Sequence, residues 1–110
     1  MAGKLNVAGA ARGLDGALGR ATVTSRTIYL ALLTAAPTVT TTLSTMTEYT
    51  ATGYARQACA MGAPSGTPQT SANTAVLTYG PLTGANGAVV LSHWALVSAA
   101  SGTTGAMTVA

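Results

Sequence analysis

The chain has 110 residues, with five basic and two acidic side chains, one histidine and one cysteine. This length allows one domain that folds without disulfides or metal ions. Charged residues make up 6% of the chain, whereas ordinary soluble domains carry about 25%. Intrinsic disorder requires low hydrophobicity and high net charge, which is the opposite composition. The composition therefore predicts a folded domain that covers part of its surface with further subunits.

Composition and charge also exclude several partners. The five basic residues are scattered along the chain: Lys4, Arg12, Arg20, Arg26 and Arg56. Because phosphate backbones are bound by clustered bases, we expect no nucleic acid partner. The longest apolar run is far shorter than the ~20 residues of a membrane span, and the first residues lack the apolar region of a secretion signal. We expect no membrane partner and synthesis in the cytoplasm.

The first twenty residues carry a weak helical pattern. Val7, Ala11, Leu14 and Leu18 recur at helical spacing. Residues 4–20 also contain Gly9, Gly13, Gly16 and Gly19, and each costs up to about 1 kcal/mol in a helix interior. The pattern therefore predicts either a weak helix that needs docking or an extended arm along a neighbouring subunit. We divide the chain into this N-terminal segment, residues 1–26, and a β domain, residues 27–110.

Residues 27–37 are the most apolar stretch and end at Pro37. Their length, and the β-formers at their start, favour a buried strand over a helix. We predict a central strand that is covered on both faces. The Thr-rich residues 38–47 that follow fit either an exposed edge strand or an ordered loop.

Residues 48–56 can be read as a β-hairpin. A loop of residues 51–53 places Gly53 at the left-handed position that such loops favour. Tyr54 then lies opposite Thr50, and Arg56 lies opposite Glu48. Since an opposite-charge pair across two strands fixes their register, we predict a Glu48–Arg56 pair.

Further strand signals follow, separated by glycine- and proline-rich turns. Alternating or apolar segments occupy residues 73–79, 88–99 and 107–110, with a turn at residues 84–87. Short strands at this spacing are typical of small antiparallel domains. We predict a mainly β fold, a small antiparallel sandwich or barrel.

The inventory of reactive side chains is thin. One histidine, one cysteine and two acids cannot supply the three or four ligands of a zinc site or a catalytic constellation. We therefore predict no enzyme, no catalytic or metal-binding residue and no cofactor. The residues that we select as structural or interface candidates are Glu48, Tyr54, Arg56, His93 and Trp94.

Several segments together resemble small virion proteins of tailed bacteriophages, which are variously labelled minor tail, tail-fibre-like or head-decoration proteins. The segments are an apolar strand that ends in Thr34-Ala35-Ala36-Pro37, then Glu48-Tyr49, Gly53-Tyr54-Ala55-Arg56-Gln57, Ser71-Ala72-Asn73, His93-Trp94-Ala95-Leu96 and Ala99-Ala100-Ser101-Gly102. The resemblance implies a β-rich domain that assembles in many copies on a virion, without catalytic residues.

Three functions follow as hypotheses. The first is a capsid decoration protein on the virion surface, which binds the major capsid protein lattice and associates with itself, for example as a trimer. The second is a minor tail or tail-fibre-like virion protein. The third, from another class, is a carbohydrate-binding module in which Trp94 and Tyr79 would have to hold the sugar with almost no acids around them.

Overall fold

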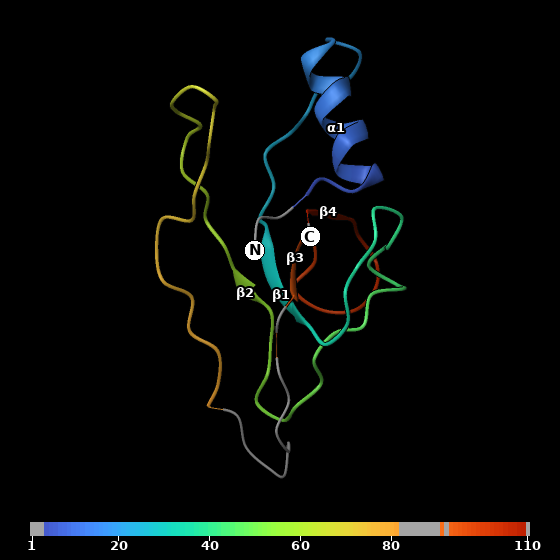
Figure 1. Cartoon of the computed structure of the whole chain (residues 1–110), viewed down its shortest axis with the longest axis vertical. Helices are drawn as coiled ribbons and strands as arrows, with labels where there is room; N and C mark the ends of the chain where they lie inside the picture. Colours follow the sequence, from blue (N-terminus) through green and yellow to red (C-terminus); the bar gives the residue numbers. More distant parts are fainter. Residues whose placement is uncertain (1–3, 82–90, 92, 110) are drawn as a thin grey trace.

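The structure is a computed structural model, and it describes residues 4–81, 91 and 93–109. One helix and one four-stranded antiparallel sheet make up its regular elements. They are α1 (Val7–Ala17), β1 (Tyr29–Leu33), β2 (Gln57–Ala58), β3 (His93–Val97) and β4 (Met107–Val109). The strand order is β2-β1-β3-β4 (Figure 1). The fold is mainly β, as predicted, but the described residues form a single sheet and show neither a sandwich nor a barrel.

Strand β1 occupies the centre of the sheet, as the sequence predicts. It pairs with β2 on one side and with β3 on the other, where Tyr29 lies opposite Val97 and Leu33 opposite His93. Ala31 and Leu33 of β1 are buried on one face, together with Ala95 and Val97 of β3, whereas the even-numbered residues of both strands are half-buried on the other face. Tyr29 and His93, the first residues of the two strands, are half-buried as well. The sheet therefore has a closed inner face and a partly covered outer face.

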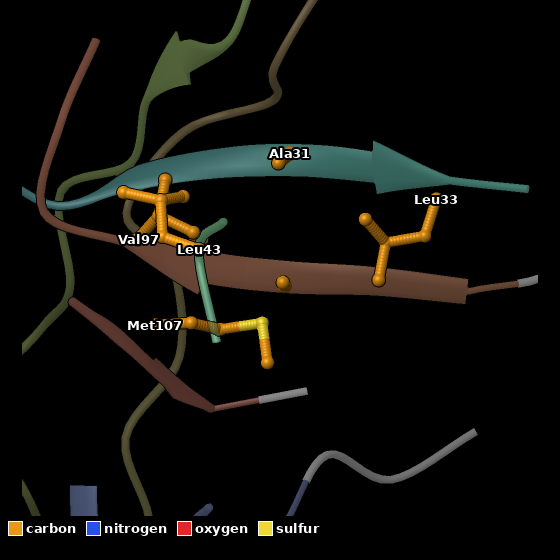
Figure 2. Packing of buried hydrophobic residues seen from close by; sticks show 6 residues of the cluster. Ala31, Leu33, Leu43, Val97 and Met107 are labelled. Carbon is orange, nitrogen blue, oxygen red and sulfur yellow. The ribbon is translucent and has the colours of Figure 1, made fainter. Parts of the chain in front are cut away.

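The hydrophobic core lies on the inner face. Leu33, Val97 and Met107 are its largest fully buried side chains (Figure 2). Leu43, from the Thr-rich segment, belongs to the same buried cluster. Eight hydrophobic residues are buried in the described part of the chain, and eight large ones are exposed. The core is thus small for a chain of this length, which leaves much apolar surface outside it.

The N-terminal segment forms a helix, which decides between the two forms that the sequence left open. Asn6 caps α1, since its side-chain oxygen accepts a hydrogen bond from the Gly9 N–H at 3.0 Å. The helix packs on β4, and Gly9 is its one buried residue. A Cβ atom at Gly9 would lie 2.1 Å from the Thr108 carbonyl oxygen. Glycine therefore permits the close approach that docks the helix. The boundary at residue 26 stays a prediction.

The Thr-rich segment is an ordered loop and not an edge strand. Two local turns repeat the same bonding pattern within it. The Thr38 N–H donates to the Thr41 hydroxyl at 2.8 Å, and the Thr42 N–H donates to the Thr45 hydroxyl at 2.8 Å. Such side-chain bonds compete with a strand ladder for the backbone groups. The composition alone, which favours strands, did not reveal this competition.

Two predicted strand regions are wrong in detail. No described strand includes residues 48–56, although the predicted turn is present, with Gly53 at a φ of 87°. Glu48 instead forms an isolated bridge with Leu33 at the end of β1. No described strand includes residues 73–79 either, where Asn73 forms a bridge with Met61. Local pattern predicted extended backbone there, but the hydrogen-bonding partners lie elsewhere in the chain.

The two strands predicted near the C-terminus are confirmed. Strand β3 lies within the predicted residues 88–99, and its Ala95 and Val97 share the buried face, as the alternation predicts. Strand β4 falls within the predicted last strand. The predicted turn at residues 84–87 lies outside the described residues. Strand β2 is limited to Gln57–Ala58, directly after the residues of the predicted hairpin.

Candidate functional site: the Glu48–Arg56 cluster and the outer face of the sheet

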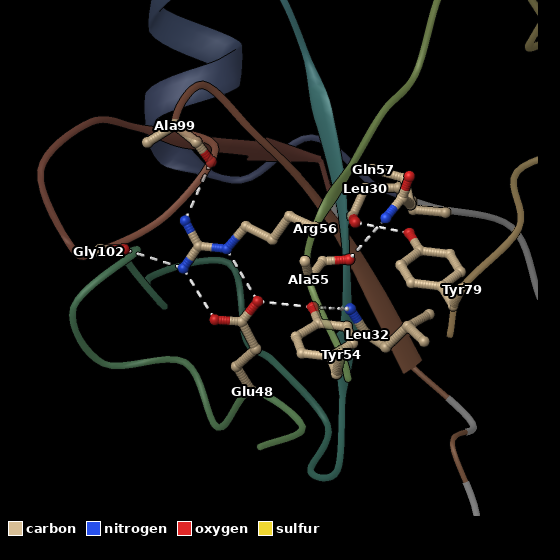
Figure 3. A network of polar contacts seen from close by, with 10 residues as sticks. All are labelled: Leu30, Leu32, Glu48, Tyr54, Ala55, Arg56, Gln57, Tyr79, Ala99 and Gly102. Atoms are coloured by element: carbon tan, nitrogen blue, oxygen red, sulfur yellow. Dashed lines mark hydrogen bonds and ion pairs between the residues drawn. The ribbon is translucent and has the colours of Figure 1, made fainter. Parts of the chain in front are cut away.

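The candidate site is built around an ion pair between Glu48 and Arg56. The Arg56 Nε donates to Glu48 Oε2 at 2.8 Å, and Arg56 Nη2 donates to Oε1 at 2.8 Å (Figure 3). The Arg56 side chain is 5% exposed and that of Glu48 is 21% exposed. A bidentate pair of this kind combines charge with fixed geometry, and partial burial reduces its screening by water.

Arg56 also connects distant parts of the chain. Its Nη1 donates to the Ala99 carbonyl oxygen at 3.0 Å, and its Nη2 donates to the Gly102 carbonyl oxygen at 2.9 Å. These carbonyls lie in the loop between β3 and β4 (Figure 3). The hydrogen bond to Glu48 is the main cause that raises the pKa of Arg56. One guanidinium thus holds together the Glu48 segment and the β3–β4 loop.

Tyr54 links the ion pair to the central strand. Its hydroxyl donates to Glu48 Oε2 at 2.6 Å and accepts the Leu32 N–H at 3.0 Å. Burial is the main cause that raises the pKa of Tyr54, and the hydrogen bond to Glu48 raises it further. The hydroxyl therefore stays protonated and serves both bonds at once.

The carboxylate of Glu48 is held in its charged form. Burial acts to raise the pKa of Glu48, but hydrogen bonds from Arg56 and Tyr54 and the charge of Arg56 outweigh burial and lower it. A charged group that is partly removed from water needs such partners. Both oxygens of the Glu48 carboxylate accept hydrogen bonds from Arg56 or Tyr54. This arrangement is typical of a structural ion pair and differs from that of a reactive acid.

Three tyrosine rings extend the cluster over the outer face of the sheet. The Tyr54 and Tyr79 rings are stacked, with centroids 5.9 Å apart, and Tyr49 meets Tyr54 edge-on at 5.6 Å. The Tyr79 hydroxyl donates to the Leu30 carbonyl oxygen at 2.6 Å. Burial is the main cause that raises the pKa of Tyr79 to about 12. Tyr79 thereby fastens a segment that runs outside the sheet onto β1.

Beside Tyr79 the outer face contains a groove of about 290 Å³. Trp94 and Tyr79 line it together with other mostly apolar side chains: Leu30, Cys59, Met61, Asn73, Leu77 and Leu96. The Tyr79 hydroxyl and the Asn73 amide nitrogen already donate to backbone carbonyls. A sugar site needs polar groups that orient the ring. The lining is better suited to the packing of apolar groups than to glycan recognition.

The structure brings together three of the five residues selected from the sequence: Glu48, Tyr54 and Arg56. His93 and Trp94 lie on β3, and Trp94 lines the groove. The sequence analysis missed the stacking of Tyr79 on Tyr54 and the two carbonyl acceptors of Arg56. Backbone carbonyls are present at every residue, so no sequence signal could have identified Ala99 and Gly102. The interface roles of the five residues stay predictions.

Two further searches cover the described part of the chain. In residues 4–81, 91 and 93–109, no three histidine, cysteine, aspartate or glutamate side chains gather in a group that could hold a metal ion. Within the same residues, no helix has the length and apolar character to cross a membrane.

Comparison with known proteins identifies a family. The family model described as Podophage GP4 fiber I protein gp80 matches residues 7–110. No curated protein and no solved structure matches the chain. The matched region includes α1, all four strands and every residue of the Glu48–Arg56 cluster.

Proposed function

Because the chain belongs to the podophage GP4 fiber I protein gp80 family and is a bacteriophage structural protein, we propose that it is a subunit of a fibre on the virion. The observation that carries this proposal is the match itself, which extends over residues 7–110. Since fibres are built from repeated copies, the proposal includes self-association of the chain.

The distribution of apolar side chains supports self-association. The described residues include eight buried hydrophobic residues and eight large hydrophobic residues that are exposed. Charged residues make up only 6% of the chain, so few charges keep copies apart. A surface of this kind fits a subunit whose faces are covered in an assembly.

The shape of the chain is compatible with the same role. Its principal extents are 49 × 27 × 22 Å, so it is clearly longer than it is wide. Hydrogen bonds of Glu48, Tyr54 and Arg56 connect β1, residues 48–56 and the β3–β4 loop to one another. Such internal bonds make a rigid module, and a structural role requires no catalysis. The absence of enzymatic activity stays a prediction.

Capsid decoration is the alternative. In that case the chain would lie on the capsid surface and bind the major capsid protein. Low charge and self-association fit both positions, whereas the family description favours the fibre. The two proposals differ in copy number and in place on the particle.

The test is quantitative mass spectrometry of purified particles, together with gold-labelled antibodies in electron microscopy. A fibre subunit is expected at a small fraction of the copy number of the major capsid protein, with label at discrete projections. A copy number comparable to that of the major capsid protein, with label spread over the head, would replace the fibre by the decoration alternative. Absence from purified particles would overturn both.

A further inference from the structure

The apolar line of α1 is largely exposed, although Val7 and Ala11 border a groove that residues 39–43 and 105–107 also line. Val7 is 60% exposed, Leu14 60% and Leu18 72%. Ala11, between them, is exposed too. In a monomeric domain an amphipathic helix turns its apolar side toward the core. Here the line of Val7, Ala11, Leu14 and Leu18, which we term the α1 seam, is left uncovered.

The opposite side of the helix faces the domain and carries glycines. Gly9 approaches the Thr108 carbonyl so closely that a Cβ atom would lie 2.1 Å from its oxygen, and a Cβ atom at Gly16 would lie 2.9 Å from Val23 Cγ2. Residues 9 and 16 are seven apart, so they share one side of the helix. The helix is therefore docked by its glycines with the seam directed outward, and rotation to bury the seam would bring larger side chains against Thr108.

The spacing of the seam matches a helix–helix contact. Its residues follow one another at intervals of four, three and four, which is the spacing of the a and d positions of a heptad. Gly9 and Gly16 then occupy the f positions, farthest from the seam. The neighbouring e and g positions hold Ala8, Ala10, Asp15 and Ala17. Three alanines among these four positions permit a close approach of a second helix.

The occupant that fits this seam is the same helix of another copy. Within the described residues α1 is the one helix of the chain. Asp15, the one charge beside the seam, is paired with Arg20 of its own chain at 3.0 Å. Identical seams that meet therefore bring together apolar side chains without an unpaired charge between them. Beside Val7, the apolar surface continues into a groove of about 370 Å³ whose wall includes Val39.

We propose that α1 is an oligomerisation helix, which packs its seam against the seam of further copies of this chain. The inference deepens the proposed function and rests on its assumption that copies of the chain assemble. It also gives the glycine-rich helix two sources of stability outside itself: Gly9 and Gly16 dock it on its own chain, and the partner covers the apolar line.

The first test measures the mass of the full chain by sedimentation over a range of concentrations. The wild type is expected to associate, and Leu14→Glu is expected to weaken association by roughly 100-fold, because the seam would then bury an unpaired charge. Val76→Glu is the matched control, since Val76 is 90% exposed and lies outside the seam. Circular dichroism checks that each variant keeps the wild-type secondary structure.

A second test does not depend on a destabilising charge. In a Cys59→Ala background, Leu14→Cys is expected to form a disulfide-linked dimer under mild oxidation. Leu14 lies near the middle of the seam, so two copies meet there whether the helices run parallel or antiparallel. Gly13→Cys is the control, because it is the adjacent position but points away from the seam, with nothing within 4 Å of its Cβ.

Two results would overturn the inference. One is a wild-type chain that stays at the mass of a single copy at every concentration. The other is an oligomer that Leu14→Glu leaves intact and that Leu14→Cys does not cross-link. Neither result would contradict the proposal that the chain is a fibre subunit, because antibody labelling of purified particles tests that proposal separately. Conversely, failure of the particle experiment would not alter a measured α1 contact, so the two failures are distinguishable.

Discussion

Glu48 and Arg56 form a bidentate ion pair although the backbone segments that carry them form no ladder. Both hydrogen bonds measure 2.8 Å, and the guanidinium is almost fully buried. The pair was expected from a hairpin register. Other contacts position the two residues. The Glu48 backbone forms a bridge with Leu33 of β1, and the Arg56 guanidinium donates to carbonyl oxygens of the β3–β4 loop.

The first prediction concerns the coupling between these two residues. In a double-mutant cycle of Glu48→Ala and Arg56→Ala, we expect a coupling free energy of about 1–3 kcal/mol, because the residues contact directly in a partly buried site. Denaturant unfolding measures it. The exposed pair of Asp15 and Arg20 serves as control, and its cycle should give about 0–0.5 kcal/mol. Equal coupling in the two cycles would contradict the assignment.

The second prediction is a loss of stability in acid that Glu48 controls. Hydrogen bonds from Arg56 and Tyr54 and the charge of Arg56 hold the pKa of Glu48 below its ordinary 4.5, even though burial opposes them. A carboxylate with a depressed native pKa binds fewer protons when folded, so its contribution to stability is present above pH 4.5 and is lost as the pH falls through the native pKa. Glu48→Gln should flatten this part of the unfolding free energy profile. A Gln variant with the wild-type slope below pH 4.5 would refute the prediction.

The third prediction is a loss of stability in alkali. Burial is the first cause that raises the pKa of Tyr54 and of Tyr79, the latter to about 12, from an ordinary 10.0. The unfolded chain releases these protons first, so stability is complete below pH 10.0 and declines as the pH rises toward the native values. Tyrosinate absorbance during unfolding at several pH values measures the effect. Tyr79→Phe should reduce it, and an unchanged alkaline decline in that variant would contradict the role of Tyr79.

The fourth prediction separates two glycines of the same helix. Gly9→Ala should destabilise the domain by more than about 1 kcal/mol, because its Cβ would overlap the Thr108 carbonyl oxygen, 2.1 Å away. Gly13→Ala meets nothing within 4 Å, and alanine is the better helix former by about 1 kcal/mol, so it should be stabilising. Thermal unfolding followed by circular dichroism gives both values. If the two variants shift the midpoint in the same direction, the docking of α1 through Gly9 is incorrect.

The fifth prediction concerns the helix cap. Asn6 is buried, accepts the Gly9 N–H and donates from its amide nitrogen to the Thr41 carbonyl oxygen at 3.2 Å. Asn6→Ala should cost about 1–2 kcal/mol, since it removes both bonds. Asn6→Asp keeps the acceptor and loses the donor, so comparison of the two unfolding free energies separates the cap from the link to the Thr-rich loop. If Asn6→Ala leaves stability unchanged, the cap does not contribute.

Much of the secondary structure followed from local pattern. The apolar run before Pro37 predicted the central strand, and β1 lies there between β2 and β3. The alternation around Ala95 and Val97 predicted that these two residues share one face of β3, and both are buried. Local pattern was sufficient in these strands because a short apolar run with β-formers predicts a strand in β1, and alternating side chains predict one in β3.

The candidate site was only half predictable. Opposite charges and a glycine turn indicated that Glu48 and Arg56 meet, and they do. The stack of Tyr79 on Tyr54 and the carbonyl acceptors at Ala99 and Gly102 were not predictable. They depend on how the β3–β4 loop and the segment after β2 fold back over the sheet, which residue types do not specify.

Sequence alone determined a low-charge, mainly β domain with a helical apolar line near its N-terminus. Only the tertiary structure decided that this line points outward. The pattern of Val7, Leu14 and Leu18 reads as a side to be buried, but contact with the Thr108 backbone requires residues without a side chain, and Gly9 satisfies that requirement on the opposite side. The close approach of Gly9 to the Thr108 backbone therefore fixes the orientation of α1 and leaves its apolar seam exposed. A hydrophobic pattern contains no information about such a steric requirement.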